Sequence, residues 1–323
     1  MNLPMLCAAL AAFTALATSA GEAWSQAWPN RPIRIIVPTA AGGGPDVVAR
    51  FIAPRLTEVL GQPIVIENRA GANAMLGAEV VARAPADGYT WLMGTGQNTV
   101  NPSVMKHVPH DIVADFAPVS LVYQSAYVLT VHPNVPARNV KEVVALARAK
   151  PDRLNFGSGG TGSAAHLSGE LFMQMTGTRM MHIPYKGVAL ALADLVGGQV
   201  DLVFPAIASG QPYVKAGRLR ALGVTSPKRH PSLPEVPTIA ETVPTFESRS
   251  WIGVLMPAGV PRAIVDRANA AIVKVVNSTE VRQSLVAQGA DPETGTPEAL
   301  HALIREEVAR AARVVKAAGI RPE

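Results

Sequence analysis

The chain has 323 residues, a formal net charge of +5 at pH 7, 48% hydrophobic residues and 5% aromatic residues. This length is sufficient for two domains of ordinary size, each with its own core. The scarcity of aromatic residues and the lack of a Lys/Arg cluster in the sequence argue against a nucleic-acid-binding surface. The single cysteine, Cys7, lies close to the N-terminus, which excludes intrachain disulfides and Cys-ligated metal sites.

Residues 1–25 have the pattern of a secretory signal peptide. Leu6–Ala17 is an apolar run too short to span a bilayer, and Ala23 and Ser25 provide small residues at positions −3 and −1 of a cleavage site. No Lys or Arg precedes the run, so a buried N-terminal helix is the alternative. We expect an exported protein from which Cys7 is removed together with the signal.

Strand-like and helix-like segments alternate along nearly the whole sequence, which is typical of an α/β protein with largely parallel sheets. In the first part, the hydrophobic pattern predicts strands at 33–37, 63–67, 90–94, 119–123 and 127–131, and helices at 45–60 and 76–81. Residues 94–118 contain several Asn and Pro residues and are expected to form loops.

The second part repeats this plan. Helices are predicted at 139–149, 164–175, 188–196 and 211–216, and strands at 153–156, 180–185, 199–204, 219–225 and 251–256. Five prolines between residues 227 and 244 indicate an ordered surface loop. Three helices are expected to close the chain, at 261–277, 280–287 and 297–317.

Each half places a glycine loop before a helix, which suggests two lobes that hold a ligand between them. We expect the chain to cross between the lobes near residues 123–130 and 219–225. Residues 26–124 and 226–323 would then form a discontinuous first lobe, and residues 125–225 a second lobe.

The first glycine loop joins the apolar run at 33–37 to the following helix. Gly42, Gly43 and Gly44 let the backbone turn sharply and approach another molecule closely. Pro45 suits a first helical turn, and Asp46 places a carboxylate near the positive end of the helix. A strand, a glycine turn and a helix N-terminus together present free N–H groups to an anion. The alternative is an ordinary turn that requires small residues.

The second glycine loop, Gly157-Ser-Gly-Gly-Thr-Gly-Ser163, matches G-x-G-x-x-G after a strand and before a helix. A dinucleotide site is disfavoured, because the next strand ends without an Asp or Glu to bind a ribose. An anion cradle is favoured, since Ser158, Thr161 and Ser163 add hydroxyl donors to the main-chain N–H groups. Ser163 as a plain N-cap is the alternative.

Motifs of common catalytic sites are missing from the sequence. No serine stands in G-x-S-x-G, and neither H-E-x-x-H nor a P-loop lysine occurs. His107, His110 and Asp111 lie in a proline-rich stretch without a spaced fourth ligand, and are expected to be solvated loop residues. We therefore expect a binding protein without enzymatic activity, metal or cofactor.

Short motifs distributed from about Trp28 to Ile320 resemble the Bug-type (TctC-like) extracytoplasmic solute receptors of tripartite tricarboxylate transporters. Each motif is weak alone, whereas their order and spacing are highly specific. The motifs are Trp28–Pro38, Ala40–Gly44 with Asp46, Glu67–Gly71, Asp87–Thr90, Asp115–Pro118, Phe156–Ser158, Gly162-Ser163, His166-Leu167, Pro184–Gly187, Gly197–Asp201 and Gly217–Leu222.

The resemblance implies an α/β, two-lobe periplasmic binding protein of type II with a hinge of two crossing strands, located in the periplasm. It implies that main-chain groups and waters at the two glycine loops hold a carboxylate of a small organic acid, with permease subunits as the membrane partner. The candidate ligand-binding residues are Thr39, Ala41, Gly42, Gly43, Asp46, Asn98, Ser158, Thr161, Gly162, Ser163, Pro205 and Ala206.

Four positions depart from the pattern of these receptors. Thr39 replaces a common aromatic residue, Asn73–Met75 replaces a more glycine-rich stretch, and Ala311 replaces a usual Trp, which we interpret as a packing change. Pro205 stands where many relatives carry Asp, which favours a ligand without an amine: a di- or tricarboxylate, or an aromatic carboxylate. The alternatives are a receptor that feeds a sensor system and an exported enzyme that uses the same cleft.

Overall fold

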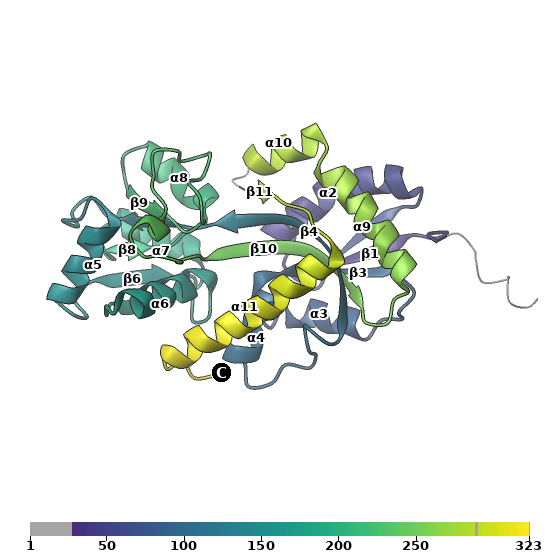
Figure 1. The fold of residues 1–323 in the computed structure, drawn as a ribbon, viewed down its shortest axis with the longest axis horizontal. Helices are drawn as coiled ribbons and strands as arrows, with labels where there is room; N and C mark the ends of the chain where they lie inside the picture. Colours follow the sequence, from purple (N-terminus) through teal and green to yellow (C-terminus); the bar gives the residue numbers. More distant parts are fainter. Residues whose placement is uncertain (1–27, 288–289, 323) are drawn as a thin grey trace, which may run out of the picture.

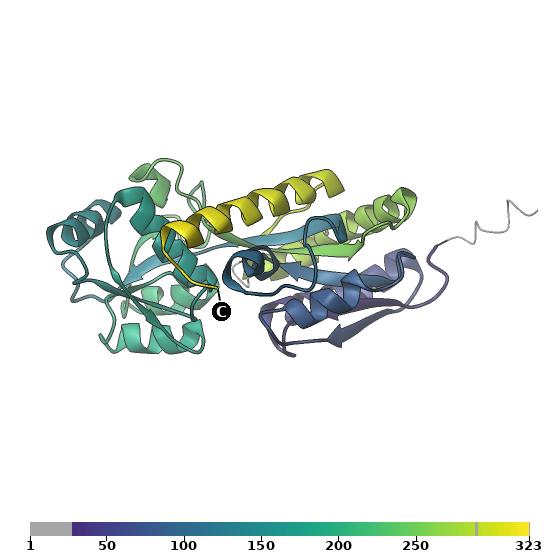
Figure 2. The same cartoon turned by 90° about the horizontal axis from the view of Figure 1, so that it is seen from below.

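The computed structural model describes residues 28–287 and 290–322, which form two α/β lobes lying side by side (Figures 1 and 2). The predicted signal peptide at residues 1–25 lies outside the described residues. Within the described ranges, the helices are too short or too polar to cross a membrane.

The first lobe is built on a six-stranded sheet. Its strands are β1 (Ile33–Val37), β2 (Ile64–Asn68), β3 (Thr90–Thr95), β4 (Phe116–Ala126), β10 (Arg249–Pro257) and β11 (Asp291–Pro292), in the order β11-β4-β10-β3-β1-β2. β1 is parallel to both of its neighbours, β2 and β3. Ile35 packs in the core on one face and Ile36 in the core on the other. Burial on both faces explains why β1 is a continuous apolar run.

Helices cover both faces of this sheet. The core on one face includes residues of α2 (Gly44–Leu60), α9 (Arg262–Val276) and α10 (Thr279–Ala287). The core on the other face includes residues of α3 (Met75–Ala82) and α11 (Pro297–Ala317). The helix α4 (Gly96–Val104) packs against α11 and β10. In Figure 1, α11 runs diagonally from the first lobe to the second, where it packs against a helix of that lobe.

The second lobe is built on a five-stranded sheet with the order β7-β6-β8-β5-β9. Its strands are β5 (Val128–Val131), β6 (Asn155–Ser158), β7 (Met181–Pro184), β8 (Leu202–Val203) and β9 (Arg220–Val224). Its helices are α5 (Val140–Ala149), α6 (Ala164–Thr176), α7 (Val188–Val196), α8 (Ile207–Lys215) and the 3₁₀ helix η2 (Ile239–Glu241). The core includes Phe172, whose ring lies 6.0 Å from Phe204 and 6.1 Å from Phe246 between centroids.

Two chain crossings join the lobes. The first passes from β4 to β5 at Tyr127, and the second enters β10 from residues 247–248 (Figure 1). Thr225 connects the two, because its hydroxyl oxygen accepts from the Tyr127 N–H at 2.8 Å and lies 2.5 Å from the Ser248 carbonyl oxygen, to which it donates. The crossings therefore share one hydrogen-bonded hinge.

The second crossing differs from the one expected near residues 219–225. β9 pairs with β5 inside the second sheet, and Ile239, Val243 and Phe246 from the following proline-dense passage belong to the second core. Residues 226–246 therefore pack on the second lobe, whereas the expected division placed them in the first. Their proline-rich composition indicates a loop and gives no information about the sheet that the loop covers.

Most of the predicted strands and helices occur in the structure within a few residues. The loop predicted at 94–118 is wrong at its start, where α4 forms. The Thr95 N–H donates to the Asn98 side chain at 2.9 Å in a capping box that satisfies the helix start. His110, expected to be solvated, is 8% exposed and packs edge-on against Phe116.

Candidate functional site

A cavity of about 260 Å³ lies between the two lobes at the hinge. It is lined by both lobes, both crossings and α11: Thr39, Pro45, Thr95, Gly96, Gln97, Val100, Tyr127, Ala164, Leu167, Leu171, Glu247, Ser248, Arg249, Ser250, Glu307, Arg310, Ala311 and Val314. Thr39 and Pro45 belong to the first glycine loop and the start of α2, and Ala164 is the first residue of α6. The two predicted glycine-bordered helix starts thus reach one shared cavity.

Asp46 fixes the shape of the first glycine loop. This carboxylate is 2% exposed and accepts from the Gly42 N–H at 2.8 Å, the Arg50 guanidinium at 2.9 Å and the Asn68 amide at 2.9 Å. The hydrogen bond from Arg50 is the main reason that the pKa of Asp46 lies below its ordinary value. The buried carboxylate therefore fixes the conformation of the loop through these hydrogen bonds. Ala41 and Gly42 lie exposed at the tip of the loop.

Two predicted residues of the first lobe offer polar atoms near the cavity. Thr39 lines it, and its hydroxyl has no hydrogen-bond partner among the described residues. Asn98 is 1% exposed, and its amide nitrogen is likewise buried without a partner there. Its neighbours Thr95, Gly96 and Gln97 line the cavity. Buried polar atoms are normally hydrogen-bonded, so the Thr39 hydroxyl is a candidate for a polar ligand, as is Nε of the lining residue Arg310, which also lacks a partner among the described residues; Asn98 itself does not line the cavity.

The second glycine loop is held by internal hydrogen bonds. Ser163 is the N-cap of α6, and its hydroxyl oxygen accepts from the His166 N–H at 3.4 Å, which is the alternative role considered from the sequence. Gly162 has a φ of +73°, and a Cβ on it would lie 3.2 Å from Val104 of the other lobe. Its N–H donates to His166 Nδ1 at 3.0 Å. Gly162 thus allows the loop to approach α4 closely, and Thr161 is exposed.

Ser158 belongs to a buried histidine cluster rather than to the cavity lining. Its hydroxyl lies 2.6 Å from His182 Nε2, and the His182 ring stacks on His166 at 3.7 Å between centroids. His166 in turn contacts Glu170 at 3.3 Å. Burial, with a smaller contribution from His166, lowers the pKa of His182 to about 4. The cluster therefore carries a neutral His182 at neutral pH.

The free energy of unfolding should rise with pH because the pKa of His182 is lowered in the folded protein. The folded pKa is about 4 and the ordinary value 6.5, so the unfolded chain binds more protons between these values, and the free energy of unfolding increases across pH 4 to 6.5. A full shift would contribute about 3 kcal/mol at about 1.4 kcal/mol per unit, and partial exposure reduces this to about 1–2 kcal/mol. Urea unfolding of the protein and of His182→Gln between pH 4.5 and 7.5 measures the difference.

A matched control for this experiment is His107→Gln, because His107 is exposed in the loop before β4. We expect this variant to keep the pH dependence of the parent, whereas His182→Gln should flatten it. An unchanged slope in His182→Gln would contradict the assignment of the pH dependence to the stacked pair.

The remaining predicted residues lie at different distances from the cavity. Gly43 is the N-cap of α2, between the lining residues Thr39 and Pro45. Pro205 is buried, and its carbonyl accepts from the Val128 N–H at 2.9 Å. Ala206 is the N-cap of α8 and pairs with Tyr127 as an isolated bridge. Pro205 and Ala206 thus contact the first crossing and do not line the cavity. The assignment of the predicted ligand-binding residues stays a prediction.

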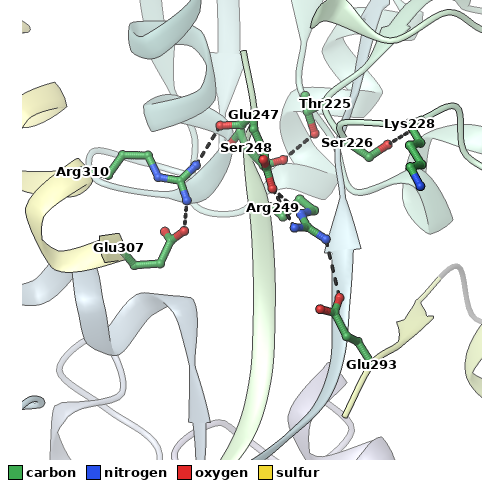
Figure 3. A network of polar contacts seen from close by, with 9 residues as sticks. All are labelled: Thr225, Ser226, Lys228, Glu247, Ser248, Arg249, Glu293, Glu307 and Arg310. Atoms are coloured by element: carbon green, nitrogen blue, oxygen red, sulfur yellow. Dashed lines mark hydrogen bonds and ion pairs between the residues drawn. The ribbon is translucent and has the colours of Figure 1, made fainter. Parts of the chain in front are cut away.

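Charged side chains that the sequence did not predict also line the cavity, and Figure 3 shows the polar contacts that join them. Arg249 donates to Glu247 Oε1 at 2.7 Å. Arg310 of α11 donates to the Glu247 carbonyl at 2.9 Å and pairs with Glu307. Burial raises the pKa of Glu307, and Arg310 opposes this rise. These contacts attach α11 to the second crossing, and each arginine has a carboxylate partner.

These features define the class of the protein. Two α/β lobes, a hinge of two crossing strands and a cavity between the lobes characterise a periplasmic binding protein of type II. Residues 48–320 match the family described as "Tripartite tricarboxylate transporter family receptor", TctC. The chain belongs to this family of solute receptors, which confirms the resemblance found in the sequence.

The relatives cover nearly the whole chain. Protein BugT of Bordetella pertussis (strain Tohama I) is 36% identical over 322 residues, which are 99% of each chain. The structure "R. palustris Rpa4515 with adipate" has 38% identity and a TM-score of 0.77, and covers 92% of this chain and 100% of that chain. The structure of MatC from Rhodopseudomonas palustris with bound malate has 32% identity and a TM-score of 0.73, with 89% and 100% covered.

Proposed function

We propose that this protein is a periplasmic receptor that captures a small organic carboxylate between its lobes and delivers it to permease subunits of a tripartite tricarboxylate transporter. One observation carries the proposal: Thr39 and Pro45 of the first glycine loop and Ala164 at the start of α6 line the same cavity. A carboxylate bound there would lie near the positive ends of two helices, one from each lobe.

The free energy required for such a complex is modest. A helix N-terminus contributes roughly 0.3–1 kcal/mol, and up to about 2 kcal/mol when partly buried. Hydrogen bonds to a charged group contribute roughly 1.5–3 kcal/mol each, and micromolar affinity requires about 8 kcal/mol. No side chain caps the start of α2 in the described structure, so its first N–H groups are available to an anion. Binding of this kind requires no catalytic group, metal or cofactor.

The relatives support the carboxylate as ligand, since the structures of Rpa4515 and MatC are described with adipate and malate. The hinge supports the receptor role. Tyr127, Thr225 and Ser248 join the two crossings through a few hydrogen bonds, and such a hinge can close two lobes around a ligand.

A thermal-shift screen of the mature protein against organic acids and amino acids tests the proposal, because a ligand that binds only the folded state raises the melting temperature. We expect carboxylates without an amine to raise it. A shift produced solely by amino acids would refute the preference, and a screen without any carboxylate hit would refute the proposed ligand class. Uptake of a confirmed ligand by cells with and without the permease genes then separates transport from a sensor role.

A further inference from the structure

The cavity wall formed by α4, α6 and α11 is apolar. Leu167 and Leu171 are four residues apart on α6, and Ala311 and Val314 are three residues apart on α11, so each pair shares a helix face. Val100 of α4 completes the wall. Hydroxyl groups of a ligand would lose water against these side chains without gaining hydrogen bonds, at a cost. The wall therefore favours carbon over oxygen in the part of the ligand that it contacts.

The two arginines on the hinge side of the cavity already have carboxylate partners. Arg249 is paired with Glu247 at 2.7 Å, and Arg310 with Glu307 (Figure 3). Arg249 also pairs with Glu293 at 3.6 Å, so a second carboxylate of the ligand on this side would compete with carboxylates that the arginines already bind. Because both arginines already have carboxylate partners, we place the anionic end of the ligand at the glycine loops and the helix starts beside them.

Ala311 sets the depth of the apolar wall. It lies on the face of α11 that lines the cavity and is 6% exposed, whereas the next residue, Ala312, is exposed and does not line the cavity. The methyl group of Ala311 leaves room for a ligand that a larger side chain at this position would occupy. Ala311 thus lines the cavity as well as packing in the protein, and its interpretation from the sequence as a packing change stays a prediction.

We propose that the wall of α4, α6 and α11 receives an apolar ligand body, with Ala311 as the residue that determines how large this body can be. This inference rests on the proposed function, and it specifies the substrate class: a carboxylic acid with an uncharged apolar body, such as a chain of about six carbons or an aromatic ring. The volume of about 260 Å³ lies just below the roughly 300–1,000 Å³ of drug-sized sites. A compact ligand of this kind fits it.

Calorimetric titration with propionate, butyrate, pentanoate and hexanoate tests the inference. Each methylene buried against the wall should tighten binding roughly threefold to fourfold. Ala311→Phe should remove this dependence on chain length, weakening hexanoate at least tenfold and propionate less than twofold. Ala312→Phe places the same side chain on the exposed face of the same helix and should bind all four acids like the parent.

The outcomes separate this inference from the proposed function. Affinity that does not increase from propionate to hexanoate, or malate binding tighter than hexanoate, would overturn the inference while the carboxylate receptor stands. Failure of every acid to bind would overturn both. Because Ala311→Phe can lower the melting temperature, Ala311→Val serves as a milder variant, for which we expect an intermediate loss for hexanoate. Equal hexanoate affinity in the parent and a folded Ala311→Phe would exclude the role of Ala311.

Discussion

Replacing Asp46 with alanine is expected to lower the free energy of unfolding by about 2–4 kcal/mol. The substitution removes a buried acceptor from three donors at once, the Gly42 N–H, the Arg50 guanidinium and the Asn68 amide. Arg50 is 53% exposed and can return to water, so the larger part of the loss should come from the two neutral donors and from the loosened loop. Urea unfolding at pH 7 measures the change.

The surface pair of Arg262 and Asp266 provides the matched control for Asp46→Ala. It is also an Arg–Asp contact between residues four apart on a helix, at 2.7 Å, but both side chains are more than half exposed. Asp266→Ala should therefore change stability little. An equal, small effect of both substitutions would show that Asp46 does not hold the loop.

We also expect the stabilisation by Asp46 to depend on pH in the acidic range. Hydrogen bonding to Arg50 lowers the folded pKa of Asp46 below 3.8, so its contribution is present above pH 3.8 and is lost as the pH falls through the folded pKa. The stability difference between the parent and Asp46→Ala should therefore narrow as the pH is lowered below 3.8. A difference that stays constant with pH would assign the effect to packing alone.

Local patterns allow much of the fold to be predicted. The apolar run of β1, the glycine turn and the Pro45–Asp46 helix start are decided by residues that are neighbours in sequence, and the structure has them where the pattern indicates. The helix α11 begins and ends at the predicted residues, because Thr296 caps its start and its apolar periodicity is regular.

Other elements depend on tertiary contacts that cannot be predicted from neighbouring residues in the sequence. The helix α4 contains Asn98, Asn101 and Pro102, which favour loops, yet these residues form a helix. The Asn101 amide donates to the Asn73 carbonyl at 2.8 Å, and α4 packs against α11. Tertiary packing overrides a weak helix propensity here.

The candidate site likewise contains residues that local sequence patterns predict and residues that only tertiary contacts bring together. The glycine loops could be found because strand, glycine and helix follow one another in the chain. Arg249 and Arg310 could not be found, because a strand and the last helix bring them together across 61 residues, and an isolated arginine in either segment looks like a surface residue. The fold places both among the residues that line the cavity, and Figure 3 shows that Arg310 reaches the second crossing from α11.

Gly43→Val is expected to weaken carboxylate binding about 100-fold, which corresponds to about 2.7 kcal/mol. Gly43 is the N-cap of α2, and a Cβ there would lie 3.1 Å from both the Ala40 carbonyl oxygen and the Thr39 hydroxyl. Either the loop opens or Thr39 leaves its place in the cavity lining, and the branched side chain also covers the N–H groups at the helix start. Calorimetry with a ligand identified by thermal shift measures the loss.

The adjacent glycine provides the control for this substitution. A Cβ on Gly44 would meet no atom closer than the Tyr123 hydroxyl at 3.8 Å, so Gly44→Ala should keep the affinity of the parent. Because Gly43 lies at the surface of the loop rather than in a core, both variants should melt within a few degrees of the parent. If Gly43→Val binds like the parent while remaining folded, the start of α2 does not hold the anion.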